Sequence, residues 1–186
     1  MSGKSALIIG SNGSEDIELV TTSDVLRRAN IQVIIAGLQD EKVIKCAEGT
    51  SINVDRLLND VIAMEFDAVI LPGGEIGSQN LAKCKRVGEI LRRHEKNGSI
   101  VAAICAAPVA LAIHGIGKGG RLTSYPSVKD LIVTAGYEYS EENVCVCKNV
   151  VTSRGPGTTF EFAMMLVELL LGKEKRQMLS NGMLLK

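Results

Sequence analysis

Short apolar runs alternate with helical segments along this chain, and that alternation restricts its possible folds more than any other feature. The runs "SALIIGS" (5–11) and "IQVIIAGL" (31–38) are rich in β-branched residues and favour strands. Between them, apolar residues recur near helical spacing, and these are Ile17, Val20, Val25 and Leu26. This part of the chain therefore predicts strand, helix, strand.

Two later runs, "AVILP" (68–72) and "IVAAI" (100–104), contain no polar residue and are separated by a helical segment, 87–98. Continuous apolar strands are typical of the centre of a parallel sheet whose two faces are both covered by helices. We therefore predict an α/β fold with a mostly parallel central sheet. In such folds, functional sites form at the carboxyl ends of the strands.

The remaining segments complete one domain over residues 1–186. Residues 43–64 predict a short hairpin and one helix, and the turn "RGPG" (154–157) opens a final helix that ends at Leu171. The last residues, 178–186, form an apolar appendage that needs cover from the domain or from a second subunit. A length of 186 residues with 46% hydrophobic content suits a single core.

Composition argues against several functional classes. Twenty-one basic and 21 acidic residues cancel, and there is no Trp, so we expect no nucleic-acid partner. The longest apolar stretch, 162–172, is about half a membrane span and contains Glu168. Without a signal-peptide pattern at the start, the chain is expected to be a cytoplasmic protein without a membrane partner. Five cysteines, an odd number without regular spacing, favour reduced thiols.

Cys105 lies where a predicted strand turns into a helix, in "AAICAAP" (102–108). The first N–H groups of a helix favour a thiolate, so this thiol is expected to be the most acidic of the five. Small neighbours such as Ala106 and Ala107 suit a strained nucleophile turn. A buried structural cysteine is the alternative interpretation of the same pattern.

The glycines of "LPGGEIG" (71–77) follow the adjacent strand. Gly73 and Gly74 lack side chains, so their backbone N–H groups could approach a ligand and form an oxyanion hole with the N–H of Ala106. A glycine-rich turn that needs positive φ is the structural alternative. Nucleotide binding has no support, because neither G-x-G-x-x-G nor a P-loop pattern is present.

A nucleophilic cysteine needs a base, but neither histidine is well placed. His94 lies in a charged helix end and is expected to be solvated, while His114 follows Cys105 by two turns and is expected to point away. The first loop offers the acids Glu15, Asp16 and Glu18 instead, and Glu18 fits best if Ile17 faces the core. A carboxylate beside a thiolate repels it, so Glu18 would have to carry a shared proton.

The other cysteines have no such setting. Cys145 and Cys147 in "VCVC" are predicted to face opposite sides of a strand and lack the C-x-x-C spacing of a zinc site. Cys46 and Cys84 have no partner by spacing. We therefore predict no metal site and no bound cofactor.

The combination of motifs resembles the ThiJ/PfpI superfamily, and within it the eukaryotic branch of parkinsonism-associated deglycases and glyoxalases. The motifs occur in the family's order over the whole chain: "EDIE" (15–18), "AVILPGG" (68–74), "AAICAAP" (102–108), "LTSYPS" (122–127) and "TSRGPGTTFEFA" (152–163). The resemblance implies a flavodoxin-like three-layer sandwich and a homodimer. It also implies a cytoplasmic location, with the nucleus or mitochondrion as alternatives.

The resemblance also implies roles for individual residues. Cys105 would be the oxidisable nucleophile, Glu18 its protonated hydrogen-bond partner, and Gly74 with Ala106 the oxyanion donors. Arg154 would lie near the site or the dimer interface.

The chain departs from relatives at several of these places. Protease-like members have a His where this chain has Ala106, and vertebrate members have a His at the position of Tyr125, which is expected to line the substrate site. Vertebrate members also carry an interface Cys at the position of Asn53 and an Arg at that of Glu48.

Two functions use these same residues. The first is a cofactor-independent cysteine glyoxalase or protein deglycase that acts on methylglyoxal, glyoxal or their protein adducts and protects against carbonyl and oxidative stress. The second is a non-enzymatic redox sensor and chaperone that is switched by oxidation of Cys105. A peptidase is disfavoured because Ala106 replaces the histidine.

Overall fold

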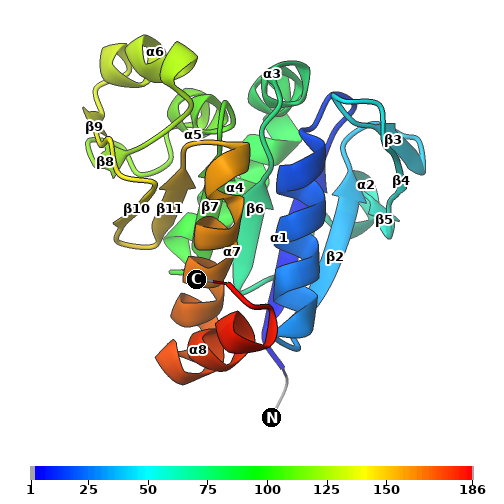
Figure 1. Cartoon of the computed structure of the whole chain (residues 1–186). Coiled ribbons are helices and arrows are strands. Elements are labelled where there is room, and N and C mark those ends of the chain that lie inside the picture. Colours follow the sequence, from blue (N-terminus) through cyan, green and yellow to red (C-terminus); the bar gives the residue numbers. More distant parts are fainter. Residues whose placement is uncertain (1–2, 186) are drawn as a thin grey trace.

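The computed structural model describes residues 3–185, and its centre is a seven-stranded sheet (Figure 1). The strand order is β10-β11-β7-β6-β1-β2-β5, and only the pair β10–β11 is antiparallel. The strands are β1 (Ser5–Gly10), β2 (Gln32–Gly37), β5 (Arg56–Leu57), β6 (Ala68–Leu71), β7 (Ile100–Ile104), β10 (Val144–Cys147) and β11 (Val150–Ser153). The predicted α/β fold with a mostly parallel sheet is confirmed.

Helices cover both faces of this sheet. On one face α1 (Asp16–Arg28) and α7 (Thr159–Leu171) lie side by side, with α8 (Lys173–Gly182) packed against α7 (Figure 1). The core of the other face includes residues of α2 (Leu58–Val61), α3 (Glu75–Lys83), α4 (Lys85–Lys96), α5 (Pro108–His114) and α6 (Lys129–Thr134). The result is the three-layer arrangement expected from the alternating sequence.

The apolar strands supply both cores at once. Because successive strand residues point to opposite faces, Leu7 and Ile9 of β1 join one apolar cluster while Ala6 and Ile8 join the other. Strands β6 and β7 divide in the same way. A strand buried on both sides has no place for a polar residue, which is why these segments are continuously apolar.

Two smaller sheets stand outside the central one. The predicted hairpin is confirmed as β3 (Val43–Lys45) paired antiparallel with β4 (Ser51–Asn53), but the helix after it is only the single turn of α2. A parallel pair, β8 (Arg121–Leu122) and β9 (Glu138–Tyr139), flanks α6. Short 3-10 turns at Pro126–Val128 and Pro156–Thr158 complete the described elements.

The orientation of α1 differs from the prediction in a way that matters for the site. Ile17 was expected on the core face, but it is 52% exposed, and Val20 on the same helix is 47% exposed. Glu18 and Leu19 are fully buried instead. The helix begins at Asp16 with Glu15 as its N-cap, and this start turns the carboxyl group of Glu18 inward.

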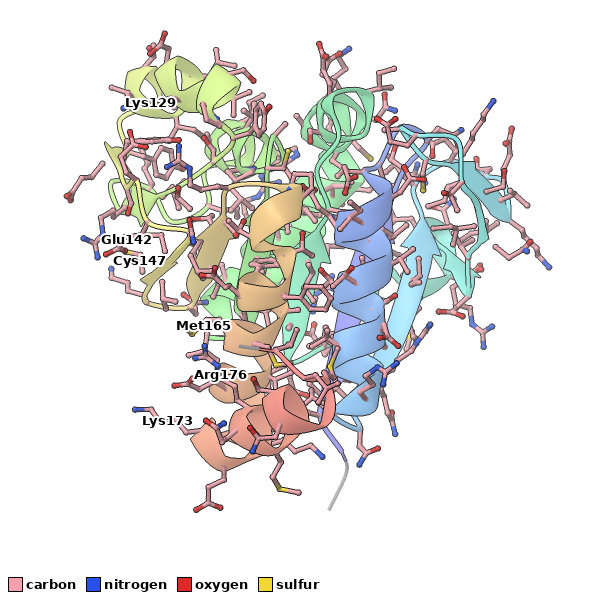
Figure 2. All side chains as sticks on the ribbon, viewed as in Figure 1. Lys129, Glu142, Cys147, Met165, Lys173 and Arg176 are labelled. Carbon is pink, nitrogen blue, oxygen red and sulfur yellow. The ribbon has the colours of Figure 1, made fainter. Side chains whose placement is uncertain are left out.

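The apolar C-terminal appendage is covered only in part. Leu179, Met183 and Leu185 pack against the core beneath α1 and α7, whereas Met178 and Leu184 are exposed. Arg176, labelled on α8 in Figure 2, forms an ion pair with Glu168 of α7. None of the helices in residues 3–185 combines the length and the apolar character needed to span a membrane.

The prediction that Cys145 and Cys147 face opposite sides of their strand is wrong. Residues two apart on a strand share a face, and both sulfur atoms lie toward the Gly120–Arg121 segment. Cys145 Sγ donates to the carbonyl of Arg121 at 3.4 Å, and a Cβ built on Gly120 would lie 3.0 Å from Cys147 Sγ. Cys147 is on the outer side of the molecule, at the β10–β11 hairpin (Figure 2).

Candidate active site

Cys105 occupies the sharp turn between β7 and α5, as the sequence predicted. Its φ of +63° lies in the left-handed region, which a non-glycine residue adopts only where its surroundings enforce it. Two backbone hydrogen bonds do so: Cys105 N–H donates to Ser153 O at 2.9 Å, and Tyr125 N–H donates to Cys105 O at 2.7 Å. The strained turn holds the thiol at the carboxyl edge of the sheet, where it is 8% exposed.

Glu18 reaches this thiol from the first turn of α1. Its side chain is fully buried, and its Oε2 accepts the Gly73 N–H at 2.7 Å. A Cβ built on Gly73 would lie within 2.6 Å of both this oxygen and the Cβ of Cys105, so the carboxyl group lies beside the Cys105 side chain. The carboxylate of Glu15 caps the helix by accepting the Glu18 N–H at 2.7 Å. The sequence-based choice of Glu18 is thus the one that the structure places beside the sulfur.

The two glycines have different roles. The backbone N–H groups of Gly74 and Ala106, the predicted pair of donors, lie close enough to the Cys105 sulfur to lower its pKa. Gly73 does not present an oxyanion donor, because its N–H is held by Glu18. It must be glycine for space, since an added Cβ would lie 2.5 Å from the Cβ of Cys105.

The prediction of an intrinsically acidic Cys105 is wrong. Burial, together with the charge of Glu18, raises the pKa of Cys105 to about 12, and the N–H groups of Gly74 and Ala106 only partly oppose this shift. Burial also raises the pKa of Glu18 to about 7, although the hydrogen bond from the Gly73 N–H acts to lower it. Two negative charges are therefore disfavoured together, and near neutral pH the pair holds a shared proton.

Neither histidine serves this site. His94 was expected to be solvated but is fully buried: its Nε2 accepts the Phe66 N–H at 3.1 Å and its Nδ1 donates to Ile90 O at 2.7 Å. Burial lowers the pKa of His94, which keeps it neutral in a structural role. His114 points away as predicted, toward Leu81 O at 3.1 Å.

An open cavity of about 630 Å³ lies in front of Cys105 and Ala106. Tyr125 lines it as expected and is 46% exposed. Arg154 does not line this cavity, because its guanidinium pairs with Glu141 Oε2 at 2.9 Å. Within residues 3–185, no three His, Cys, Asp or Glu side chains are grouped so that they could hold a metal ion.

Two walls of the cavity were missed by the sequence analysis. Helix α3 contributes Glu75, Ser78, Gln79, Ala82 and Lys83, although "LPGGEIG" was interpreted only as a loop. Helix α6 contributes Leu131 from a segment that was not assigned. The helical spacing of Ser78, Leu81 and Ala82, all buried, was the signal that could have revealed α3.

Sequence comparison finds relatives that match most of the chain. The sequence profile described as "DJ-1/PfpI family" matches residues 4–169. "Protein dj-1beta" of Drosophila melanogaster is 46% identical over 182 residues, which cover 97% of each chain. "Glutathione-independent glyoxalase DJR-1.2" of Caenorhabditis elegans is 46% identical over 173 residues, covering 92% of this chain and 91% of that protein.

Solved structures show the same fold. The crystal structure of Drosophila melanogaster DJ-1beta superposes with a TM-score of 0.97 at 45% identity and covers 100% of both chains. The structure of oxidised Toxoplasma gondii DJ-1 superposes with a TM-score of 0.94 at 31% identity and covers 98% of both chains.

Proposed function

This chain belongs to the DJ-1/PfpI family, and we propose that it is a cofactor-independent glyoxalase whose nucleophile is Cys105. The observation that carries the proposal is the contact of a strained thiol with a buried carboxyl group and two backbone N–H donors, at the edge of an open cavity. The name of the nematode relative, a glutathione-independent glyoxalase, supports the same reaction class.

The first step joins sulfur to the aldehyde carbon of methylglyoxal. Because the pKa of Cys105 is raised, its proton must leave as the sulfur attacks, and the Glu18 carboxylate is placed to accept it. The carbonyl π electrons move to oxygen, which becomes an alkoxide near the N–H groups of Gly74 and Ala106. Glu18 then gives its proton to this oxygen, which completes a hemithioacetal.

The second step moves hydrogen between adjacent carbons. Ionised again, Glu18 removes the proton from the former aldehyde carbon and returns it to the neighbouring carbon through an enediol. The product is a thioester of lactate on Cys105. Water then cleaves this thioester, releasing lactate and restoring the thiol, so that the net reaction is addition of one water to methylglyoxal.

The same attack would apply to methylglyoxal already added to a protein thiol, amine or guanidinium group. Such an adduct either releases the free aldehyde or reacts at its carbinol carbon. In the second case the bond from that carbon to the protein nitrogen or sulfur breaks as the bond to Cys105 forms, and the proton taken by Glu18 passes to the released group. The open cavity supports access for a modified side chain, so the proposed activity extends to deglycation of proteins.

Lactate release from methylglyoxal tests the proposal. We expect turnover by the wild-type protein, loss of turnover in Cys105→Ser, and a fall of about a hundredfold or more in Glu18→Gln, which cannot transfer a proton. His114→Ala and Cys147→Ser are the controls and should remain close to wild type. Turnover that survives Cys105→Ser, or that depends on His114, would exclude this mechanism.

The second candidate function is a redox sensor, which the same pair of Cys105 and Glu18 favours. Peroxide would oxidise the Cys105 sulfur to sulfinate, whose oxygen atoms could accept from a protonated Glu18 and from backbone N–H groups. The Toxoplasma gondii relative is described as oxidised, which supports oxidation within the family. Because the Glu18 carboxylate can take the thiol proton, peptide mass analysis after limiting peroxide should locate sulfinate on Cys105; preferential oxidation of Cys84 or Cys147 would reject this role.

A further inference from the structure

The cavity in front of Cys105 continues along α5 as an apolar groove. Val109 and Ile113 line it from one face of this helix, and Ala106 lines it from the turn before the helix. With a rise of about 1.5 Å per residue, the stripe from residue 106 to residue 113 extends roughly 10 Å from the reacting sulfur. Ile113 at its far end is 63% exposed.

Helix α6 and the turn before it form the facing apolar wall. Val128 and Leu131 line the groove at a spacing of three residues, and Leu131 is 57% exposed. The next residue, Ile132, is fully buried in the core and holds this short helix in place. Large apolar side chains are thus presented to solvent on two helices that border one cavity.

The third wall, α3, is more polar. Ser78 lines the cavity but is only 4% exposed, and its buried hydroxyl has no hydrogen-bond partner among residues 3–185. Gln79 and Lys83 extend this polar side.

A substrate as small as methylglyoxal would contact only the part of the groove next to Cys105. We propose that the preferred substrates are 2-oxoaldehydes carrying an apolar arm of several carbons, which lies between α5 and α6 against Val109, Ile113 and Leu131. This inference rests on the glyoxalase function proposed above. The arm adds binding energy at a distance from the reacting carbons, while Cys105 and Glu18 act on every member of the class alike.

The test compares kcat/KM for 2-oxoaldehydes with methyl, propyl and hexyl arms. Each buried methylene is worth a factor of about four, so we expect the hexyl compound to exceed methylglyoxal by at least about tenfold. The gain should lie mainly in KM, because the arm does not change the reacting atoms.

Variants on α6 provide a matched comparison. Leu131→Asn should remove most of the preference for the longer arm, measured as the ratio of kcat/KM for the hexyl compound to kcat/KM for methylglyoxal. Val133→Asn changes an apolar residue on the same helix that is 50% exposed but does not line the cavity, and it should keep the preference. Equal effects of both variants would overturn the assignment of the arm to this groove.

The outcomes separate this inference from the proposed function. If methylglyoxal is turned over but kcat/KM does not depend on arm length, the assignment of the arm to the groove is wrong and the proposed glyoxalase function is retained. If no 2-oxoaldehyde is turned over, the glyoxalase fails, and N-alkyl maleimides of increasing arm length probe the groove directly. Alkylation of Cys105 that accelerates with arm length, against a constant rate at Cys84, supports the groove; a constant rate at Cys105 overturns it.

Discussion

Ionisation of a carboxyl group as deeply buried as Glu18 opposes folding. The unfolded chain releases this proton near the ordinary value of 4.5, whereas the folded protein retains it until the pKa of about 7. The folded state therefore binds more protons between these values, and its stability falls as the pH rises from about 4.5 to about 7. Below this range both states are protonated and the difference disappears.

Glu18→Gln should consequently stabilise the protein at neutral pH. The shift corresponds to about 3 kcal/mol in the free energy of unfolding at pH 7, with little gain at pH 4. Denaturant unfolding at the two pH values measures this difference. Glu174→Gln, at the exposed start of α8, is the control and should show neither effect. If Glu18→Gln were less stable than the wild type at pH 7, the ionised Glu18 carboxylate would not be the group that lowers the stability of the wild type.

The same proton governs the pH dependence of turnover. Glu18 accepts the thiol proton only when ionised, so kcat/KM should rise about tenfold per pH unit below the Glu18 pKa of about 7 and level off above it. His114→Ala should keep this profile. A rise that disappears with His114 rather than with Glu18 would assign the base to the histidine.

At the scale of elements, the loop from β6 to α3 sets the geometry around the sulfur. Gly74 has a φ of +87°, and an added Cβ would lie 2.2 Å from Gly13 O, so the backbone itself must shift if a side chain is introduced. That shift would move the Gly74 N–H away from Cys105.

Gly74→Ala should therefore reduce both stability and turnover. Gly49→Ala is the matched control, because its φ is +99° but no atom lies within 4 Å of the added Cβ. The control should lose only the backbone strain of about 1–2 kcal/mol and keep its activity. Thermal unfolding and lactate release measure the two effects. Equal losses in both variants would mean that close packing at Gly74 is unimportant.

At the scale of the whole molecule, we expect a homodimer. Ile17 and Val20 lie three residues apart on one face of α1 and are about half exposed, so a monomer would leave them in water. Light scattering at micromolar concentration should give about twice 19.9 kDa, and Val20→Glu should shift the protein toward the monomer. A monomeric wild-type mass would contradict this prediction.

The sequence by itself determined the layered α/β fold, and it predicted Cys105 and Glu18 as the pair that the structure then places side by side. Continuous apolar runs such as β6 and β7 can be buried only at the centre of a covered sheet, and the small residues around Cys105 are needed wherever a strand turns sharply into a helix. Glu18 was identified by excluding the histidines and by family resemblance. The sequence alone could show these features, because they depend on neighbouring residues, composition and motifs.

Only the tertiary structure decided the environment of that pair and the shape of its cavity. The pKa of Cys105 depends on burial and on a carboxyl group from α1, and these outweigh the local N–H donors that the sequence emphasised. His94 is buried because Phe66 and Ile90 surround it, although its neighbours in sequence are charged. The groove is lined by faces of α3, α5 and α6. No single segment of the sequence encodes such a surface, because the three helices are brought together only by the fold.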